Sequence, residues 1–377
     1  MEKRKMEKIG AETSLLGFGC MRFPTTAEGK IDENAAEQML DKAISAGVNY
    51  IDTAYPYHGG ESEPFVGRVL QKYDRASIYL ATKLPVWKVK KPEDVDAIFE
   101  EQLSRLQTDY IDFYLMHALD KEDWDAMVAM GTVKRLEELK AEGKIRYLGF
   151  SFHDKYEVFE EILNYRDWDF CQIQLNYMDT NEQAGLKGYE LTVQKQVPLV
   201  IMEPVKGGLL AAFAEDIAGK FRALDKEASI ASFALRWVGS LPNVKVILSG
   251  MSTMEQVEDN LKTFGQFRPL NGEESRTIEE VVDILNSRVQ NGCTACRYCM
   301  PCPAGVNIPG TFRIWNTYHM YQNYNIVKGR WEHMEESARP KNCIKCGKCE
   351  QACPQKLNIR EDLEKAQEDL DKKEMIV

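Results

Sequence analysis

The sequence predicts an α/β protein: a (β/α)8 barrel, the TIM-barrel fold, followed by a small and mostly α-helical domain. Over about the first 265 residues, eight short apolar or β-branched runs alternate with amphipathic helical patterns. In the remaining part there is no strand alternation, and eight of the ten cysteines form two tight runs. A doubly wound sheet is the alternative for the first part. Because no G-x-G-x-x-G follows the first strand, the barrel is preferred.

The barrel elements follow from the apolar runs and from the residues that punctuate them. Strands are expected at Leu15–Gly19, Asn49–Asp52, Ser77–Thr82, Tyr110–Met116, Arg146–Gly149, Phe170–Gln174, Pro198–Met202 and Val244–Leu248. Helices between them include Asn34–Ala46, Pro92–Leu106, Thr132–Glu142 and Lys226–Val238. Asp32 precedes the first helix as its capping residue, and Gly47 and Gly143 follow helix ends.

The barrel pattern ends near Pro269 and Gly272. We therefore expect the barrel over residues 1–268, a helical connector over 269–290 and the cysteine-rich domain over 291–377.

The C-terminal elements are predicted to be helical. Glu273–Val289 has an amphipathic pattern, and Ile308–Lys328 is rich in aromatic residues that suit a helical core. The segment after Ile359 is dense in charges and indicates a solvated helix.

Composition and charge exclude several classes of protein. The net charge is −11, with acidic residues spread along the chain, which argues against nucleic-acid binding. No apolar run approaches the ~20 residues of a membrane span. The N-terminal stretch MEKRKMEKIG is charged and lacks the apolar core of a signal peptide, so we expect a cytoplasmic protein with reduced cysteines. Cys20 and Cys171 lie in apolar segments and are expected to be buried structural thiols.

The two cysteine runs have the spacing of an iron–sulfur site. The first run is Cys293-x2-Cys296-x2-Cys299-x2-Cys302-Pro303, and the second is Cys343-x2-Cys346-x2-Cys349-x3-Cys353-Pro354. Successive three-residue steps place several thiolates around one short turn, which suits a cubane cluster. Two four-thiolate zinc sites are the main alternative, but structural zinc usually takes paired CxxC steps separated by a longer insert.

These runs resemble those of bacterial-type ferredoxins, and the aromatic spacer between them resembles the α-helical ferredoxin type. In that family the fourth cysteine of each run ligates the other cluster, so the resemblance implies two [4Fe-4S] clusters. The implied ligand sets are Cys293, Cys296, Cys299 and Cys353 for one cluster, and Cys343, Cys346, Cys349 and Cys302 for the other. The gap before Cys302 is one residue shorter than the family pattern, so this position departs from it.

Four polar side chains follow three consecutive strands of the predicted barrel. Asp52 ends the second strand, Tyr57 follows it, Lys83 ends the third and His117 ends the fourth. The C-terminal ends of barrel strands lie at one rim, where barrel enzymes keep their chemistry. A nearby ammonium favours the phenolate and lowers the pKa of a phenol, and a carboxylate keeps that ammonium charged and fixed. The set therefore indicates proton transfer at this rim.

At these residues the chain resembles the aldo-keto reductase family, over roughly residues 9–265. The shared motifs are Ile51-Asp52-Thr53-Ala54-x-x-Tyr57, Gly60-Glu61-Ser62-Glu63, Thr82-Lys83 and Leu115-Met116-His117. That family reduces aldehydes and ketones with NADPH or NADH. The resemblance implies that Tyr57 is the general acid and that Lys83 lowers its pKa. It also implies that Asp52 holds Lys83 and that His117 orients the substrate carbonyl. Tyr57 is preferred to Tyr55 because the family tyrosine lies five residues after the aspartate.

The same resemblance implies a nicotinamide-nucleotide site. Ser151 and Gln172 match residues that bind the carboxamide, and Met202 falls where the family has an aromatic that stacks on the nicotinamide ring. A methionine covers an aromatic face more loosely. Lys206 and Gly207 are candidates for the pyrophosphate, with a plain loop as the alternative.

In the family, residues in the segment after the last strand bind the adenosine 2′-phosphate of NADPH. The matching stretch includes Gly250, Gln256 at a position where arginine is common, and Asn260 as the adenine contact. Without a cation in this stretch a 2′-phosphate is weakly held, so NADH is expected to serve at least as well as NADPH. No flavin motif is present, but flavin stays an alternative occupant.

A hydride transfer in the barrel moves two electrons, whereas each cubane cluster moves one, so the role of the clusters in the reaction is open. Three interpretations remain. The first is a reductase of aldehydes, ketones, enones or quinones whose clusters exchange electrons with a ferredoxin or another redox protein. In the second, the clusters of such a reductase are structural or redox-sensing. The third is an electron-transfer or redox-sensing subunit whose barrel binds nucleotide without turnover. The intact set of four rim residues favours an enzyme.

Overall fold

The computed structural model describes residues 1–373 and contains two compact units. Unit 1 comprises residues 1–207 and 231–271, and unit 2 comprises 208–230 together with the chain from Gly272 onward. The division near 271 lies close to the boundary expected at 268. By its contacts, segment 208–230, which was expected within the barrel domain, groups with the C-terminal part, and so do residues 272–290 of the expected connector.

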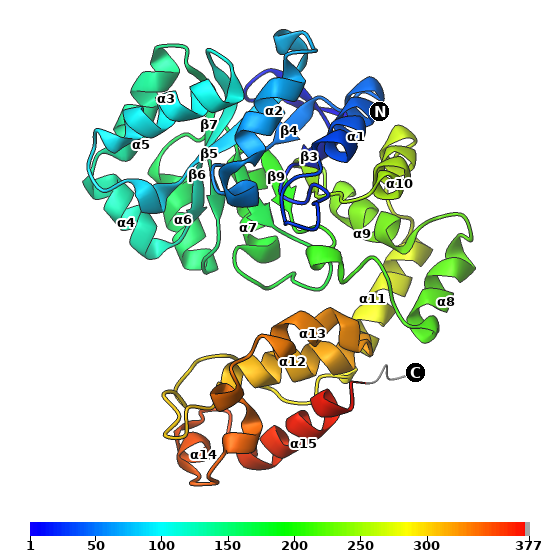
Figure 1. Cartoon of the computed structure of the whole chain (residues 1–377). Coiled ribbons are helices and arrows are strands. Elements are labelled where there is room, and N and C mark those ends of the chain that lie inside the picture. Colours follow the sequence, from blue (N-terminus) through cyan, green and yellow to red (C-terminus); the bar gives the residue numbers. More distant parts are fainter. Residues whose placement is uncertain (374–377) are drawn as a thin grey trace. The chain divides into compact units, whose positions relative to one another are not determined.

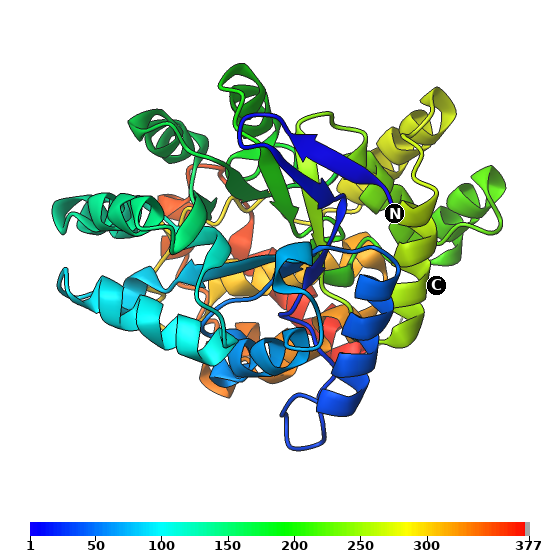
Figure 2. The same ribbon diagram turned by 90° about the horizontal axis from the view of Figure 1, so that it is seen from above.

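Unit 1 is a closed barrel of eight parallel strands in the order β10-β3-β4-β5-β6-β7-β8-β9. The strands are β3 (Leu16–Gly19), β4 (Tyr50–Asp52), β5 (Tyr79–Leu84), β6 (Ile111–Leu119), β7 (Ile145–Phe152), β8 (Cys171–Gln174), β9 (Leu199–Met202) and β10 (Val244–Ser249). Each of them overlaps one predicted strand, so the barrel prediction is confirmed. Figure 2 shows the barrel from above, with helices arranged around the strands.

Helices of unit 1 cover the outside of the barrel (Figure 1). They are α1 (Glu33–Ser45), α2 (Ser62–Leu70), α3 (Asp94–Leu106), α4 (Lys121–Ala129), α5 (Thr132–Ala141), α6 (Tyr156–Tyr165), α7 (Gly185–Gln194), α9 (Ile230–Gly239) and α10 (Met254–Gly265). Asp32 caps α1 as expected, because its side chain accepts a hydrogen bond of 3.1 Å from the amide of Ala35. The buried face of α1 packs into the layer between helices and strands.

A hairpin that the sequence analysis missed precedes the barrel. Strands β1 (Lys3–Met6) and β2 (Ala11–Ser14) pair antiparallel, and Met6 and Ala11 belong to the same cluster as the side chains inside the barrel. Both strands are four residues long and contain several polar residues, so they lack a clear apolar alternation.

Unit 2 is helical, as predicted. Its helices are α8 (Glu215–Leu224), α11 (Gly272–Ser287), α12 (Ile308–Tyr321), α13 (Tyr324–Glu332), α14 (Lys348–Ala352) and α15 (Ile359–Lys372). Helix α8 joins α11 through an ion pair of 3.0 Å between Lys220 and Glu280, and Asp216 of α8 pairs with Arg288, which directly follows α11. These contacts explain why segment 208–230 belongs to this unit.

The last helix corrects one expectation. Helix α15 is not solvated on all sides, because Ile359, Leu363, Ala366 and Leu370 are buried in the core of unit 2. Their spacing of three and four residues is that of an amphipathic helix, and the high charge of the other faces hid it. Residues 374–377, which end the predicted tail, lie outside the described part.

Unit 2 is built on an internal repeat. Gly305 and Lys356 each follow the last cysteine of their run by three residues, and their φ angles are 77° and 52°. Their amides donate to the carbonyls of Cys302 and Cys353 at 2.9 and 3.1 Å. Helices α12 and α15 then begin two residues after Val306 and Leu357 in the shared pattern Cys-Pro-x-x-Val/Leu-Asn-Ile. This repeat was not among the features predicted from the sequence.

None of the helices that the structure describes is both long enough and apolar enough to cross a membrane.

Candidate active site and cluster sites

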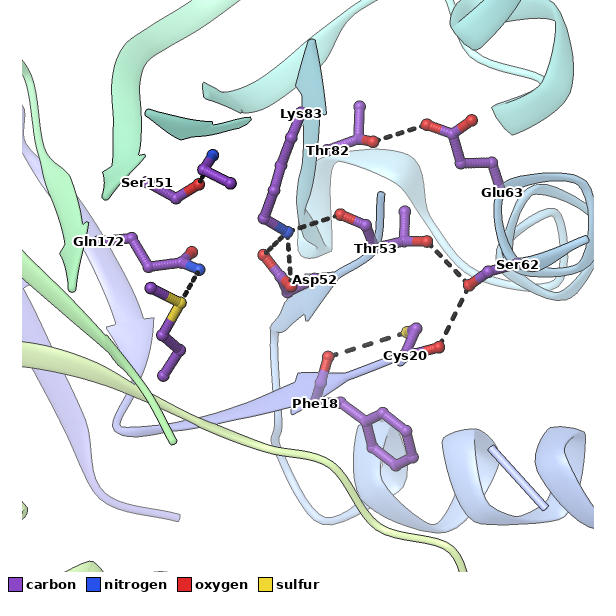
Figure 3. A network of polar contacts seen from close by, with 12 residues as sticks. Phe18, Cys20, Asp52, Thr53, Ser62, Glu63, Thr82, Lys83, Ser151 and Gln172 are labelled. Atoms are coloured by element: carbon purple, nitrogen blue, oxygen red, sulfur yellow. Dashed lines mark hydrogen bonds and ion pairs between the residues drawn. The ribbon is translucent and has the colours of Figure 1, made fainter. Parts of the chain in front are cut away.

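A buried ion pair lies at the C-terminal rim of the barrel. The Lys83 ammonium, from β5, is 2.8 Å from each carboxylate oxygen of Asp52, from the neighbouring strand β4. It also donates to the backbone carbonyl of Thr53 at 2.8 Å (Figure 3). Burial opposes the charge of Lys83, but Asp52 and Tyr57 outweigh it and raise the pKa of Lys83. The ammonium therefore stays protonated and its three N–H groups are engaged.

Tyr57 lies against this ammonium. The Lys83 nitrogen is 5.2 Å from the centroid of the Tyr57 ring. Burial raises the pKa of Tyr57, and Lys83 acts in the opposite direction. The effect of Lys83 thus has the expected sign, but the net direction of the Tyr57 pKa is upward because burial outweighs it. A raised pKa keeps the phenol protonated at neutral pH, which is the form that a general acid needs.

Tyr55, the alternative acid, is engaged elsewhere. Its hydroxyl accepts a hydrogen bond of 2.8 Å from Lys88 and is 3.1 Å from a carboxylate oxygen of Glu101. The guanidinium of Arg105 lies over its ring, 4.3 Å from the centroid. Tyr55 therefore belongs to an exposed polar cluster, whereas Tyr57 faces Lys83. This arrangement agrees with the choice of Tyr57.

His117 completes the rim set. Its ring lies 6.2 Å from that of Tyr57 and 5.2 Å from that of Trp87. Burial, together with the charges of Lys83 and His153, places the pKa of His117 well below 6.5, so the imidazole is neutral at neutral pH. Its Nδ1 is buried without a hydrogen-bond partner among the described residues. A buried, unsatisfied nitrogen next to Tyr57 suits the binding of a polar ligand atom.

The sequence analysis missed Trp87 as a rim residue. Its side chain is 41% exposed although it contacts His117, so a flat apolar surface adjoins the polar groups. Trp87 lies in the loop after β5, where a single aromatic residue among prolines and lysines gives no sequence pattern.

A second group of buried polar side chains, centred on Glu63, holds β5 in place. The buried carboxylate of Glu63 accepts a hydrogen bond of 2.6 Å from Thr82 (Figure 3). It also accepts one of 2.7 Å from Gln102 and is paired with Arg105 at 3.1 Å. The same Gln102 amide reaches the carbonyl of Lys83 at 3.0 Å. Glu63, known from the sequence only as part of a motif, therefore positions the strand that carries Lys83.

Ser151 and Gln172 lie side by side on β7 and β8, where their Cα positions pair directly. The Ser151 hydroxyl accepts a hydrogen bond of 2.7 Å from the amide of Ala118, which follows His117 with φ 56°. The Gln172 amide donates to the sulfur of Met202 at 3.3 Å, and its carbonyl oxygen is buried without a partner among residues 1–373. Such an oxygen fits the amide group of a nicotinamide.

The remaining nucleotide candidates lie on loops and helix ends of unit 1. Asn260 is buried and donates to Ser249 at 2.7 Å, while the Gln256 side chain accepts from the amide of Ser252 at 2.7 Å. Lys206 is paired with Asp179, and Gly207 has φ 63°. Gln256 therefore stabilises its own loop, and Lys206 already has a counter-charge.

Arg22 is a cation that the sequence analysis missed in this region. A Cβ on Gly250 would lie 2.6 Å from Cγ of Arg22, so the arginine side chain crosses Gly250 directly. Its carbonyl accepts a hydrogen bond of 2.7 Å from Ser252. Arg22 follows β3 and is more than 200 residues away in sequence, which is why a scan of the last barrel loop did not find it.

The eight cysteines of the two runs line two cavities in unit 2. Cys299, Cys302, Cys343, Cys346 and Cys349 line one of about 240 Å³. Cys293, Cys296, Cys299 and Cys353 line a narrower one of about 20 Å³. Each cavity thus combines three cysteines from one run with the last cysteine of the other, and Cys299 lines both cavities. Among residues 1–373, no three His, Cys, Asp or Glu side chains are close enough to hold a single metal ion. The thiols are thus spread more widely than the ligands of one metal ion, and the larger cavity leaves a space between them.

The two runs share the same backbone conformation. Ala295 and Lys345, each two residues after the first cysteine of its run, have φ 55° and 56°. Arg297 and Gly347, each directly after the second cysteine, have φ 64° and 74°. Only the stretch before the last cysteine differs, because the second run has the short helix α14 there and the first has Met300-Pro301. The shorter gap consequently does not prevent Cys302 from reaching the cavity of the second run.

Comparison with known protein families agrees with this geometry. The aldo/keto reductase family model matches residues 15–283, and the 4Fe-4S dicluster domain model matches residues 292–357. The chain belongs to the aldo/keto reductase family and carries a C-terminal 4Fe-4S dicluster domain. It is an oxidoreductase of that family.

Known relatives resemble the barrel part of the chain. An uncharacterised oxidoreductase of Bacillus subtilis, YqkF, is 29% identical over 311 residues, which cover 74% of this chain and 96% of the relative. The NADH-specific methylglyoxal reductase of Escherichia coli is 29% identical over 304 residues, 68% of this chain and 93% of the relative. Among solved structures, the holo form of the aldo-keto reductase AKR11C1 from Bacillus halodurans has a TM-score of 0.62 at 29% identity. That match covers 74% of this chain and 96% of AKR11C1.

Proposed function

We propose that this protein is a nicotinamide-dependent reductase of small carbonyl compounds in which Tyr57 is the general acid. The buried ion pair between Lys83 and Asp52, directly beside Tyr57, carries the proposal. A structural ion pair has no need of a partly exposed phenol and a neutral, unsatisfied imidazole beside it. Together these groups offer a proton donor and an acceptor-binding site at one point of the barrel rim.

Each residue has a distinct task in this proposal. Tyr57 gives its proton to the carbonyl oxygen, and the fixed charge of Lys83 stabilises the phenolate that remains. Asp52 keeps Lys83 protonated, and the neutral imidazole of His117 orients the carbonyl. Ser151 and Gln172 would hold the carboxamide of a nicotinamide nucleotide and Met202 would contact its ring, and the nucleotide would supply the hydride when bound. Trp87 covers the apolar part of the substrate and helps to exclude water.

NADH is expected to support reduction at least as well as NADPH. Gln256, at the position where an arginine is common, is held by the amide of Ser252, and Lys206 is paired with Asp179. The name of one relative, the NADH-specific methylglyoxal reductase, agrees with this expectation. The measurement is kcat/KM for both nucleotides with methylglyoxal as test substrate. A strong preference for NADPH would contradict the proposal, and Arg22→Ala would then show whether Arg22 causes that preference.

We also propose two [4Fe-4S] clusters with crossed ligation, one in each cysteine-lined cavity, within a cytoplasmic protein. The composition of the two cavities supports this assignment, because each combines three cysteines of one run with the last of the other. The clusters connect the reductase with one-electron chemistry or regulate it.

An anaerobic titration distinguishes these two roles of the clusters. If the clusters exchange electrons with the barrel, NADH is expected to bleach the cluster absorbance of the intact protein. Dithionite, which reduces accessible clusters directly, is the positive control. Carbonyl turnover without bleaching by NADH would instead support structural or sensing clusters. The absence of any Tyr57-dependent turnover would support a binding scaffold.

A further inference from the structure

The loops that carry the cysteines differ from the rest of the chain in charge. Residues 291–305 and 339–360 contain seven cationic side chains and one carboxylate, Glu350, within a chain of net charge −11. The cations are Arg297, Arg339, Lys341, Lys345, Lys348, Lys356 and Arg360. Arg297 and Lys348 are exposed and have no ion-pair partner among the described residues. A free excess of positive charge therefore surrounds the cluster sites.

The same loops carry the most exposed large apolar side chains of the described chain. Tyr298 is 70% exposed and Ile344 is 66% exposed, more than any other large apolar residue among residues 1–373. Both line the larger cavity together with Cys302, Cys343, Cys346 and Cys349. Each lies inside a cysteine run, so its position is fixed by the loop that would bind a cluster. Exposed aromatic and aliphatic residues ringed by cations are typical of a protein-binding surface.

We propose that this cluster face, defined by Arg297, Tyr298, Ile344 and Lys348, is the docking surface for an acidic electron-carrier protein. Charge complementarity selects an acidic partner, and the two apolar side chains provide the desolvated centre of the interface. Cys346, which lines the cavity behind the face, is itself exposed, so a docked carrier lies next to the proposed cluster. This inference rests on the proposed cluster sites.

A competing explanation is that the cations merely offset the negative charge that thiolate-bound clusters bring. That role requires cations near the clusters but no binding of another protein. It also does not explain why Tyr298 and Ile344 point into solvent beside the larger cavity. If the cations only offset the charge of the clusters, reversing them changes how much iron the protein binds. If they form a docking surface, reversing them changes the affinity for the partner protein.

Binding to a purified acidic two-cluster ferredoxin tests the proposal. The full-length, iron-loaded protein is immobilised under anaerobic conditions, and the affinity is measured at several salt concentrations. We expect saturable binding that weakens as salt increases, and a loss of about tenfold or more in the variant Arg297→Glu/Lys348→Glu. The matched control Lys328→Glu/Arg330→Glu reverses two exposed cations on α13, outside the cysteine loops, and is expected to change the affinity by less than about twofold.

Three results would overturn the proposal: no saturable binding at low salt, equal effects of the two double variants, or equally tight binding of a basic cytochrome. Iron content is measured in every sample. Fully loaded protein that fails to bind contradicts the docking surface alone, whereas protein that cannot be loaded contradicts the cluster sites. If Arg297→Glu/Lys348→Glu itself loses iron, the variant Tyr298→Ser/Ile344→Ser takes its place, with an expected loss of affinity at an unchanged salt dependence.

Discussion

Replacing Lys83 with methionine is expected to lower kcat for carbonyl reduction by about 10²–10⁴-fold, the usual contribution of a positioned acid–base system. The Lys83 ammonium is the cation next to Tyr57, and its three N–H groups are fixed by Asp52 and Thr53. Without it, the phenolate that forms as Tyr57 gives up its proton has no neighbouring positive charge. The measurement is single-turnover reduction of methylglyoxal with saturating nucleotide.

Stability is a separate effect that this experiment must control. Lys83→Met leaves Asp52 buried without a counter-charge, which costs about 3–5 kcal/mol of unfolding free energy. The double variant Asp52→Asn/Lys83→Met removes that buried charge and is expected to recover much of the stability but none of the rate. Lys88→Met, which removes the exposed ammonium beside Tyr55, is the matched control and is expected to retain kcat. Recovery of the rate in the double variant would contradict the role of Lys83.

The pH dependence of the same reaction has a defined sign. Burial raises the pKa of Tyr57, so the phenol is protonated throughout the neutral range and kcat is expected to be constant there. The rate then falls at alkaline pH as Tyr57 loses its proton before reaction. Removing Lys83 takes away the group that opposes the upward shift, so the residual activity of Lys83→Met is expected to fall at a higher pH. A decrease in kcat that already begins below pH 7 as the pH is raised would contradict Tyr57 as the general acid.

Cys302→Ser is expected to reduce the iron content from about eight to about four atoms per chain, because Cys302 lines the cavity of the second run. Iron and sulfide are measured on protein purified and reconstituted without oxygen. Cys171→Ala, which changes a buried thiol of the barrel, is the matched control and is expected to keep full loading. Fewer than about eight irons in the unaltered protein would contradict two cubanes.

Pairs of cysteine variants distinguish crossed ligation from an arrangement in which each run binds its own cluster. Cys302→Ser combined with Cys346→Ser is expected to lose no more iron than either change alone, because both thiols line one cavity. Cys302→Ser combined with Cys296→Ser is expected to lose both clusters, since Cys296 lines the other cavity. The opposite pattern would mean that each run binds its own cluster.

The barrel could be predicted because its eight strands are short apolar runs separated by capped helices, a pattern that local sequence displays directly. The hairpin of β1 and β2 could not, because its four-residue strands contain charged and hydroxyl residues and are fixed by packing under the barrel. The contacts of segment 208–230 with unit 2 could not be predicted for a related reason. Helix α8 of this segment forms ion pairs with α11 and with Arg288 directly after it, and the paired residues lie 60 or more positions apart, which no local pattern records.

The candidate site likewise contains some features that could be predicted from the sequence and others that could not. Asp52, Tyr57 and Lys83 follow strand ends in a known motif, so their proximity follows from barrel geometry. The net direction of the Tyr57 pKa does not, because it depends on how much protein surrounds the hydroxyl. Trp87 and Arg22 were missed since each is a single loop residue whose neighbours in space are distant in sequence. Likewise, the sequence alone did not show whether Cys302 reaches the cavity of the second run across the shorter gap. That depends on the backbone at Met300-Pro301.

The two cysteine cavities have a mechanical consequence for unit 2. With crossed ligation, each cluster would join the segment before α12 to the segment around α14, about 40–60 residues further along the chain. The clusters then act as two covalent staples that close the same loop, and such staples stabilise a small helical unit chiefly by restricting its unfolded chain. Oxygen that destroys a cluster would accordingly release α12, α13 and α15 from their anchor. Loss of a cluster would thereby lower the unfolding free energy of these helices, which the apolar core of the unit would then hold alone.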